Sequence, residues 1–308
     1  MSKYIGVIGG SGFVGSEIVK QLKSDGYKVR VIDIKKSDEG LADYKQADVT
    51  LLEEIVTATG GLDGIIHLGA VVGVDVCNSD SQLVKNVNLE GVKNVVEACK
   101  INNIRRLLFS SSSEVYGDGD KTPFNEDGVK FPKSVYGKTK LLAEEFLKTQ
   151  ASDMLKISIV RYFNVYGENQ RNEFVVKKFI EKALNNESIT IYGDGGQVRC
   201  YTHIDDAVYG TLLVYYNQKD VYNIFNVANL QPLTVTDLAR MIILKTDSKS
   251  NIKYIKLDSP ESRSQDIEIF KRIPCIDKIT KTFGYTAKMS IEEGLSSIIK
   301  NIKARSAL

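Results

Sequence analysis

Tyr136 and Lys140, four residues apart, form the pair in this sequence that is best suited to acid–base chemistry. Residues at this spacing lie on one face of a helix. A phenol is a poor base near neutral pH because its reference pKa is about 10, and a neighbouring ammonium lowers that pKa by stabilising the phenolate. The hydroxyl of Ser112, at the end of an expected strand, could hold a substrate alcohol next to Tyr136. Such pairs also occur by chance on many helices, so the interpretation depends on the surrounding sequence.

The stretch "GGSGFVG" at residues 9–15 follows an apolar strand pattern and opens a helical one. In a dinucleotide-binding turn of this kind the first glycine permits a tight turn and the middle one lets the backbone approach a pyrophosphate. The last glycine lets the helix pack on the strand. The phosphates then lie on free N–H groups at the positive end of the helix. We expect five residues of this turn to contact the cofactor: Gly9, Gly12, Phe13, Val14 and Gly15.

The next expected strand ends on Asp33, 18 residues after the last glycine of the turn. A carboxylate at this place accepts hydrogen bonds from the adenosine ribose and repels a 2′-phosphate, so NAD is favoured over NADP. Lys35 and Lys36 weaken this preference slightly because they could neutralise a phosphate, although such lysines are more often solvated. Without Asp33, the glycines would suit a ligand-free turn almost as well. An oxidised nicotinamide is positive and would help Lys140 to lower the pKa of Tyr136.

Short apolar runs alternate with helix-length segments along the first half of the chain. The runs predict strands at residues 4–8, 28–33, 64–68, 105–110 and 156–161. The segments between them predict helices at residues 12–24, 51–57, 79–100 and 134–151. Strands that are apolar throughout and separated by helices indicate a parallel sheet covered on both faces. With right-handed crossovers this gives an α/β fold with a doubly wound parallel sheet of the Rossmann type.

Beyond residue 165 the alternation becomes less regular. Strands are expected at residues 188–192 and 222–227, and helices at residues 173–184, 235–244 and 291–303. We expect residues 1–165 to form the NAD-binding domain, with some later segments returning to it. Residues 166–308 are expected to form a smaller mixed α/β region that binds the substrate across the carboxyl edge of the sheet.

The composition narrows the class of protein. The 308 residues carry 41 basic and 39 acidic side chains, which argues against a nucleic-acid or membrane-surface partner. The longest apolar stretch, residues 65–76, is too short and too often interrupted to span a bilayer. The four cysteines are widely separated and the chain has two histidines, so we expect no metal site. Reduced cysteines, and an apolar strand directly after the first three residues, favour a cytoplasmic protein without a leader peptide.

Further motifs continue the pattern along nearly the whole chain. They are "ADV" at residues 47–49, "HLGA" at 67–70, "VNLEG" at 87–91, "SSSSEVYG" at 110–117, "YGKTK" at 136–140, "RYFNVYG" at 161–167, "IYGDGGQVRCYTHIDD" at 191–206 and "MSIEEGL" at 289–295. Together with the glycine turn and Asp33, these motifs make the chain resemble the extended short-chain dehydrogenases/reductases, specifically the NAD-dependent nucleotide-sugar epimerase/dehydratase family. The resemblance implies an enzyme with tightly bound NAD and a nucleotide-diphosphate sugar as its substrate.

The resemblance also implies roles for single residues. The matches to the catalytic triad are Ser112, Tyr136 and Lys140, of which the last two also contact the cofactor. On the cofactor side the further matches are Asp48 and Val49 at the adenine ring, Leu68, Gly69 and Ala70 along the cofactor channel, and Asn88 near the active site. The matches on the substrate side are Ser112, Ser113, Asn164, Arg199 and Arg263. Guanidinium groups suit a diphosphate because they bind it in bidentate fashion, although the context of Arg263 matches loosely and would also suit a surface arginine.

The resemblance implies a shared first step, in which a sugar carbon, usually carbon 4, is oxidised to a ketone while hydride passes to NAD. Glu114 bears on the fate of that ketone. It could act as a base, as in dehydratases and decarboxylases that also carry serine before this glutamate, or it could only anchor the turn by hydrogen bonds. The dTDP-glucose-type dehydratases carry an aspartate where this chain has Ser113. We therefore expect epimerisation or release of the 4-keto sugar, with dehydration or decarboxylation as the alternative.

Two further expectations concern the oligomeric state and whether the protein is an enzyme or a regulator. The helices expected at residues 79–100 and 134–151 resemble those that form an intersubunit four-helix bundle in relatives, which implies a homodimer. Helices that cover the sheet of a monomer have the same pattern. A regulator that binds NAD(P) without turnover is the alternative from another class, but such proteins typically lack the pair that Tyr136 and Lys140 form here.

Overall fold

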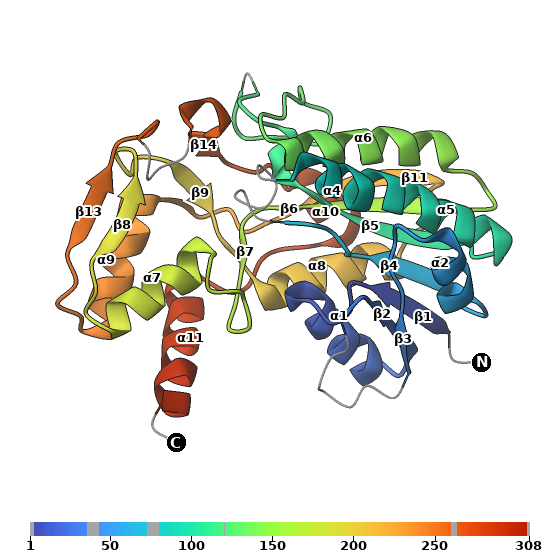
Figure 1. Ribbon diagram of the computed structural model, residues 1–308, viewed down its shortest axis with the longest axis horizontal. Coiled ribbons are helices and arrows are strands. Elements are labelled where there is room, and N and C mark those ends of the chain that lie inside the picture. The colour runs from blue at the N-terminus through green and yellow to red at the C-terminus, as the bar shows by residue number, and fades with distance from the viewer. Residues whose placement is uncertain (1–2, 36–42, 73–79, 120, 260–263, 307–308) are drawn as a thin grey trace.

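The structure is a computed structural model that describes residues 3–35, 43–72, 80–119, 121–259 and 264–306 (Figure 1). A larger part, built around one sheet, lies on the right of this view, and a smaller part with short strands lies on the left. The chain passes between the two parts more than once, because the last strand of the large sheet follows elements of the smaller part in sequence.

Within the described residues the large sheet has seven strands: β1 (Tyr4–Ile8), β2 (Lys28–Asp33), β3 (Tyr44–Gln46), β4 (Gly64–His67), β5 (Arg106–Ser112), β6 (Lys156–Tyr162) and β11 (Tyr222–Val227). Their order is β11-β6-β5-β4-β1-β2-β3, and all neighbours are parallel. The chain winds from β1 outward to β3, returns to place β4 on the other side of β1, and continues outward to β11. The doubly wound parallel sheet predicted from the sequence is thereby confirmed, and its crevice lies where the order reverses, between β1 and β4.

Helices cover both faces of this sheet (Figure 1). One face carries α1 (Phe13–Ser24), α8 (Ile204–Tyr216) and α10 (Asp277–Phe283), and the other carries α2 (Leu52–Thr59), α5 (Gly91–Ile101) and α6 (Val135–Gln150). The sequence does not predict α8, because buried residues occupy most of its circumference and leave no amphipathic period.

The helix expected at residues 79–100 is divided. Its described part begins with α4 (Ser81–Lys85), continues through a π-helical turn, η1 (Asn86–Glu90), and ends with α5. A π turn of this kind inserts an extra residue into the helix and is frequent at functional sites. The periodic sequence pattern continues through it, so the interruption has no sign in the sequence.

In the residues that the structure describes, the smaller part contains two pairs and one triplet of short strands. They are β7 (Val165–Tyr166) with β10 (Thr202–His203), β8 (Ile189–Tyr192) with β13 (Ile252–Ile255), and β9 (Val198–Cys200) between β12 (Pro232–Thr234) and β14 (Lys271–Arg272). Its helices are α7 (Val175–Leu184), α9 (Val235–Thr246) and α11 (Ile291–Ser306). We keep the division at residue 165 as a proposal, with α8, β11 and α10 as the later segments that return to the large sheet.

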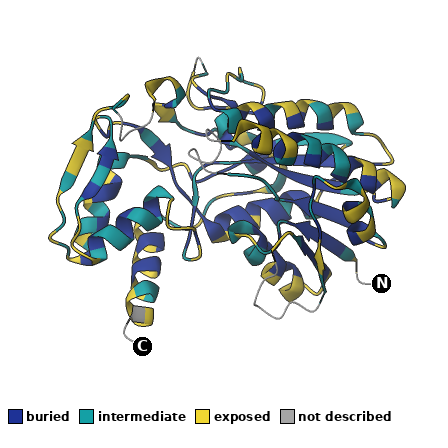
Figure 2. Cartoon of the chain, viewed as in Figure 1, coloured by how far each residue is buried: buried dark blue, intermediate teal, exposed yellow. Residues whose placement is uncertain are grey.

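Buried side chains form one cluster on each face of the large sheet and a third cluster among α7, α9 and α11 (Figure 2). The clusters leave the carboxyl edge of the sheet, where strands end and loops begin, to polar residues such as Ser112 and Asp33. No helix in the described ranges combines the length and the apolar character that a membrane crossing requires.

A buried ion pair ties α6 to β6. The Arg161 guanidinium donates to both carboxylate oxygens of Glu144, at 2.9 Å from Nε and 2.5 Å from Nη2, and the two side chains are 1% and 3% exposed. Ser111 on β5 donates to the same carboxylate at 2.5 Å, and Arg161 donates to the Tyr116 hydroxyl at 2.8 Å. A buried pair is tolerated when such additional hydrogen bonds satisfy both partners. The network therefore fixes the helix of the expected catalytic pair against the ends of β5 and β6.

We expect Glu144→Gln to lower the free energy of unfolding by about 3–5 kcal/mol, because it leaves the Arg161 charge buried without its counterion. The matched control is Glu90→Gln, which breaks a surface pair with Lys93 whose side chains are 46% and 42% exposed. The control should change the free energy of unfolding by less than about 1 kcal/mol. Urea unfolding at neutral pH measures both, and equal midpoints for the two variants would contradict the importance of the buried network.

Candidate active site

The glycine turn between β1 and α1 leaves no room for side chains on its inner side. Gly9 has φ +77°, a left-handed conformation that favours glycine, and a Cβ there would lie 2.6 Å from the backbone nitrogen of Gly69. A Cβ at Gly15 would overlap the carbonyl oxygen of Gly9. At Gly12, among the described residues, a Cβ would meet the Gly9 carbonyl oxygen alone, at 3.2 Å. The turn is therefore packed inside and open at Gly12, as the approach of a pyrophosphate requires.

The groups around this opening fit a dinucleotide. The first-turn N–H groups of α1, which begins with Phe13 and Val14, have no carbonyl of the same helix to bind. The hydroxyl of Ser11 is buried and has no hydrogen-bond partner in the part of the chain that the structure describes. At the end of β2, the Asp33 carboxylate accepts from the N–H groups of Ser11 at 3.0 Å and Lys35 at 3.1 Å, which holds it beside the turn. Phosphate oxygens would meet donors here and ribose hydroxyls would meet an acceptor.

Asp48 and Val49, expected at the adenine ring, precede α2. One carboxylate oxygen of Asp48 accepts from the backbone N–H and the hydroxyl of Thr50, at 2.9 and 2.8 Å, and so shapes the turn before the helix. Val49 is buried, and its carbonyl accepts from the side-chain amide of Asn94 at 2.8 Å. Their contact with an adenine ring stays a prediction.

The segment 68–70 follows β4 and lies against the glycine turn, because the N–H groups of Leu68 and Gly69 both donate to a carbonyl at the end of β1. Ala70 leads to Val71, which Asn88 clamps: the Asn88 amide accepts from the Val71 N–H at 2.8 Å and donates to its carbonyl at 3.0 Å. Asn88 lies in the π turn η1 and is buried. It therefore fixes the loop that borders the cofactor channel, and the contacts of 68–70 with the cofactor stay predictions.

Helix α6 brings the acid–base pair to the same edge of the sheet. Ser134 caps its N-terminus by accepting from a first-turn N–H at 3.0 Å. Lys140 is 1% exposed, donates to the Ser110 carbonyl at 2.7 Å, and lies with Nζ 5.8 Å from the centre of the Tyr136 ring. Burial lowers the pKa of Lys140 to about 7, against the opposing effect of a carboxylate one turn along α6. A poorly solvated ammonium beside a phenol favours the phenolate.

The serines at the end of β5 lie close to α6, which packs against β5 and the turn that follows it. Ser112 ends the strand, and its hydroxyl accepts from the Glu114 N–H at 3.2 Å, capping the short helix η2 (Ser113–Val115). The Ser113 hydroxyl is buried and has no partner among the described residues, and the same holds for Oδ1 of Asn164, just beyond β6. Asn164 also has φ +40°. Buried unpaired acceptors and unusual backbone angles are concentrated at ligand sites.

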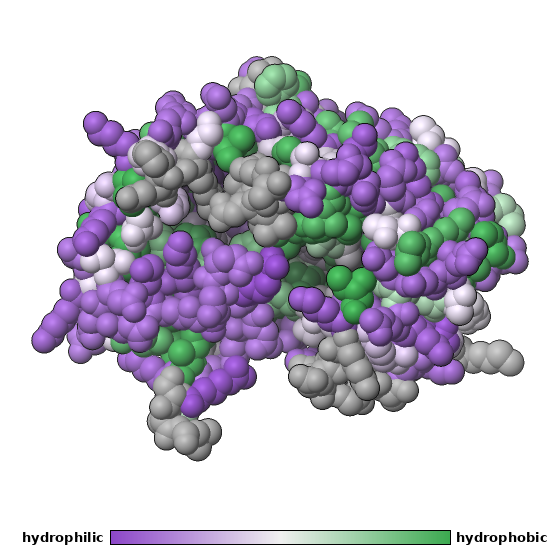
Figure 3. Space-filling view, in the orientation of Figure 1, coloured by the Kyte–Doolittle hydropathy of each residue, from purple (hydrophilic) through white to green (hydrophobic). Residues whose placement is uncertain are grey.

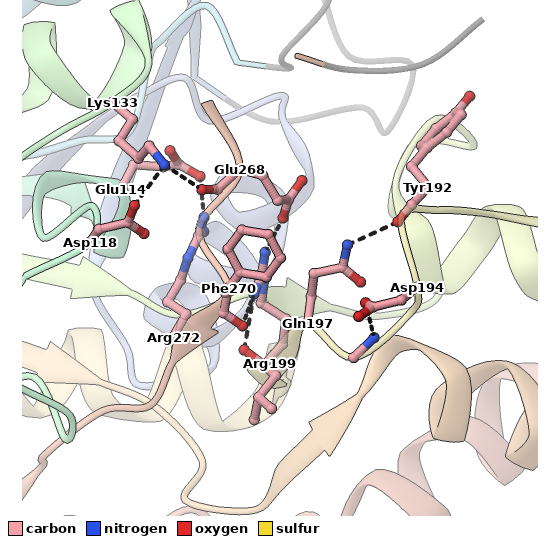
Figure 4. Close-up of polar contacts among 12 residues, drawn as sticks. Glu114, Asp118, Lys133, Tyr192, Asp194, Gln197, Arg199, Glu268, Phe270 and Arg272 are labelled. Carbon is pink, nitrogen blue, oxygen red and sulfur yellow. Dashed lines mark hydrogen bonds and ion pairs between the residues drawn. The ribbon is translucent and has the colours of Figure 1, made fainter. Parts of the chain in front are cut away.

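Glu114 is held by two donors, of which Figure 4 labels Arg272. Arg272 of β14 donates to its Oε1 at 2.5 Å, and the Ser134 hydroxyl donates to its Oε2 at 3.0 Å. The Glu114 and Arg272 side chains are 18% and 11% exposed. Burial by itself raises the pKa of Glu114, but Arg272 and Ser134 outweigh it and hold that pKa below its usual value. Both oxygens of this carboxylate are therefore engaged, and it is a weak base as it stands.

Arg199, expected at the diphosphate, lies on β9, and Arg272 is its register partner on β14. The Arg199 guanidinium pairs with Glu268 at 2.6 Å and donates to two backbone carbonyls (Figure 4). Burial, followed by the charge of Arg272, lowers the pKa of Arg199 to about 10. Two guanidinium groups side by side, each balanced by one carboxylate, can attract a further anion. Arg263, the other arginine expected here, lies outside the described residues.

Comparison with known proteins identifies the family. Residues 5–228 match the model of the NAD dependent epimerase/dehydratase family. The chain belongs to this family. A curated relative, the UDP-N-acetyl-alpha-D-glucosaminuronate decarboxylase of Bacillus cytotoxicus, is 28% identical over 321 residues, covering 97% of this chain and 98% of the relative.

Two solved epimerase structures have the same fold as this family member. The UDP-glucose 4-epimerase of Thermotoga maritima with UDP-glucose has a TM-score of 0.90 and 28% identity, with 98% of this chain and 99% of that chain covered. The UDP-glucose 4-epimerase of Thermus thermophilus in complex with NAD has a TM-score of 0.88 and 25% identity, with 97% and 99% covered. The predictions of family, fold class and cofactor are thereby confirmed: the protein is an NAD-dependent enzyme of the extended short-chain dehydrogenase/reductase type.

Sequence reasoning missed Arg272 and Glu268 in this epimerase/dehydratase site. Both lie in a stretch without a motif, and the contact of Arg272 with Glu114 joins residues 158 positions apart, so no local pattern reveals it. Ser134 had a usable signal, since a serine directly before a predicted helix is the usual sign of an N-cap.

Lys140→Met should raise the urea midpoint at neutral pH even though it removes activity. The pKa of Lys140 is about 7 in the folded protein and 10.5 in the reference state, so the unfolded chain binds more protons between these values. Burial of the ammonium therefore opposes folding most strongly below about pH 7, and this opposition fades as the pH approaches 10.5. The variant's advantage in urea midpoint should be largest at about pH 6–7 and shrink by about pH 9.5.

The control for this prediction is Lys138→Met, which removes an exposed ammonium from the same helix and should give no such pH dependence. An advantage of Lys140→Met that stays constant over the pH range, or a lower midpoint than the wild type at neutral pH, would contradict the lowered pKa.

Proposed function

We propose that this enzyme oxidises carbon 4 of a nucleotide-diphosphate sugar to a ketone, and then either returns the hydride to the opposite face or releases the 4-keto product. The observation that carries the proposal is the Tyr136 phenol beside the buried ammonium of Lys140, at the sheet edge that also carries the glycine turn. NAD, when bound there, would supply the hydride acceptor. The protein's own task is then to move one proton and to hold the sugar.

Tyr136 is the group that takes the hydroxyl proton from the sugar and gives it back when the carbon is reduced again. One pKa unit corresponds to about 1.4 kcal/mol, so bringing a phenol from about 10 to about 7 requires about 4 kcal/mol. A close ammonium in a site without water can supply much of this. Ser112, at the end of β5, would hold the reacting hydroxyl in line with Tyr136.

The nucleotide end of the substrate is proposed to bind in the smaller part of the molecule. Arg199 lies in the middle of β9 in the smaller part and Asn164 lies just beyond the end of β6, and a guanidinium suits a diphosphate. Uridine diphosphate sugars are the first class to test, because the decarboxylase from Bacillus cytotoxicus and both epimerases described above act on or bind them by name.

Dehydration or decarboxylation of the 4-keto sugar is the second candidate. It is favoured by the serine that precedes Glu114 and by the 28% identity to the decarboxylase. The engagement of both Glu114 oxygens by Arg272 and Ser134 argues against dehydration, because elimination of water needs a base with a free oxygen directed at the carbon-5 proton. Decarboxylation needs no such base, since carbon dioxide leaves while the carbon-5 hydrogen stays in place.

Tyr136→Phe should lower kcat for the accepted nucleotide sugar by about 10²–10⁴-fold with little change in NAD binding, because it removes the proton acceptor and keeps the ring. Tyr209→Phe is the control; Tyr209 is 39% exposed on α8, away from the pair, and its loss of a hydroxyl should leave kcat unchanged.

The same assays identify the product by mass spectrometry. Unchanged mass with altered stereochemistry indicates epimerisation, and loss of two hydrogens indicates release of the ketone. Loss of water or of carbon dioxide indicates the second candidate. Full activity of Tyr136→Phe, or absence of any conversion by the wild type across UDP-, GDP- and dTDP-sugars, would overturn the proposed function.

We propose the cytoplasm as the location of this enzyme. The cysteines that the structure describes, Cys99, Cys200 and Cys275, are free thiols, which suits a reducing compartment. Cys77 lies outside the described residues.

We also propose a homodimer formed through the outer faces of α4, α5 and α6. Leu83 on α4 and Leu142 on α6 are 42% and 46% exposed, and Ile101 at the end of α5 is 51% exposed. Figure 3 shows apolar surface, broken by polar side chains, over the helices at the upper right of the view. A second copy placed on these helices would remove the apolar side chains from water.

Leu142→Glu should convert the proposed dimer to a monomer, because a charge would be buried in the contact between the two copies. Light scattering after gel filtration should give twice the 34.2 kDa chain mass for the wild type and a single chain mass for the variant. Leu244→Glu on α9, where the leucine is 82% exposed, is the control and should stay dimeric. A monomeric wild type would exclude the dimer.

A further inference from the structure

A chain of polar contacts joins Arg199 and Arg272, which Figure 4 labels together with Glu114, to the start of α6. Arg272 stands beside Arg199 on paired strands, and it binds Glu114, which in turn binds Ser134 at the N-cap of α6. Arg272, Glu114 and Ser134 come from three separate segments of the chain. Tyr136 lies two residues beyond the last of them.

We propose that Glu114 and Arg272 are positioning residues that tie the N-terminus of α6 to the arginine-bearing strands β9 and β14, and that Glu114 takes no proton from the substrate. The inference rests on the proposed function and deepens it. Among the possible outcomes after oxidation of carbon 4, it excludes elimination of water with Glu114 as the base that removes the hydrogen on carbon 5.

The first step of the argument is the double role of Ser134. Its hydroxyl accepts from the Gly137 N–H at 3.0 Å and donates to Glu114 at 3.0 Å, and the residue is 7% exposed. The direction of the capping hydroxyl therefore depends on the carboxylate. The backbone of Glu114 also packs on the first turn of α6, since a Cβ at Gly137 would lie 2.8 Å from the Glu114 carbonyl oxygen. A displacement of Glu114 must move the turn that carries Tyr136.

The second step is the charge of Arg272. Its guanidinium is largely buried, and its Nε has no hydrogen-bond partner among the described residues. If Glu114 turned away to act on a substrate, the guanidinium would lose its counterion in a poorly solvated place, which is strongly unfavourable. The ion pair therefore keeps the Glu114 carboxylate in one position.

The third step is a parallel contact one residue earlier in the chain. Lys133 donates to Asp118 at 2.6 Å and to the backbone carbonyl of Glu268 at 2.7 Å, and the Glu268 side chain pairs with Arg199. Of the two residues before α6, Lys133 is thus bound directly to the segment that carries Glu268 and Arg272, and Ser134 is bound to it through Glu114. The start of α6 is therefore held at two points relative to Arg199 and Arg272. A substrate whose phosphates bind these arginines would then have Tyr136 in a fixed position.

Kinetics of three variants test the proposal: Glu114→Gln, Arg272→Met and the double variant. Each single variant should lower kcat by about 10-fold while KM changes by less than about 3-fold, and the double variant should be no worse, because all three remove one and the same contact. Arg272→Lys should recover part of the loss. Turnover in D₂O should leave the original hydrogen in place on carbon 5 of the product.

A proton-transfer role for Glu114 gives the opposite order. Glu114→Gln would then lower kcat by about 10²–10⁴-fold, whereas Arg272→Met would free the carboxylate and keep or raise kcat. That order, or replacement of the original carbon-5 hydrogen by deuterium, overturns the proposal. Arg240→Met is the control, since it removes an exposed arginine of α9 whose partner Asp237 lies on the same helix, and it should change neither constant.

A second measurement needs no substrate. Hydrogen exchange of the amides at residues 135–138 should become about 10-fold faster in Arg272→Met and in Glu114→Gln than in the wild type or in Arg240→Met. Should Arg272→Met fail to fold, Glu114→Gln, which keeps the side-chain size, provides the test. Unchanged exchange would show that Glu114 and Arg272 do not hold the start of α6 in place. If the wild type converts no nucleotide sugar, the proposed function fails while this measurement still decides whether the tie exists.

Discussion

An ammonium group kept away from water is the constraint on which the active site depends. Lys140 lies between the carbonyl of Ser110 and the face of the Phe109 ring, 4.5 Å from its centre, and is almost completely buried. A charge in such a place is unfavourable for folding, but it is effective toward a neighbouring phenolate because no solvent competes for it. The rest of the molecule therefore has to hold α6, which carries both groups, in one position.

Two buried or half-buried ion pairs provide that restraint at different points of α6. Glu144, in the middle of the helix, binds Arg161 on β6, and Ser134, at its start, binds Glu114 and through it Arg272. The first pair fixes the helix to the sheet that also carries the glycine turn. The second joins it to the smaller part, where the nucleotide is proposed to bind. Proximity of a proton acceptor and a reacting hydroxyl is worth most when neither can move, and this arrangement restricts both.

The sequence was sufficient for the fold because its strongest patterns arise from local physical requirements. Parallel strands buried on both faces are rich in apolar residues, so β1 could be placed with its observed ends, and β2 and β11 could also be placed although polar residues interrupt them. Helix α8 lacked a pattern because it is surrounded by protein, and the π turn η1 lacked one because a single inserted residue hardly disturbs the period. The glycine turn and the Tyr136–Lys140 spacing were visible for the same local reason.

The partners of Glu114 were not visible, since side chains that meet across 158 positions are brought together by the whole fold. The sequence could therefore present Glu114 as a base or as an anchor, and left both open. The contacts of Glu114 with Arg272 and Ser134 in the structure provide a physical argument for the role of an anchor over that of a base.

The single oxygen of Ser134 restricts which amino acids can start α6. Acidic and amide side chains are common N-caps because they need only accept from the helix. Here the capping group must accept from Gly137 and, through the same atom, donate to a carboxylate. An ionised aspartate has no proton to donate and would face a second negative charge, so this position excludes aspartate and accepts only side chains that can both accept and donate for as long as Glu114 remains ionised.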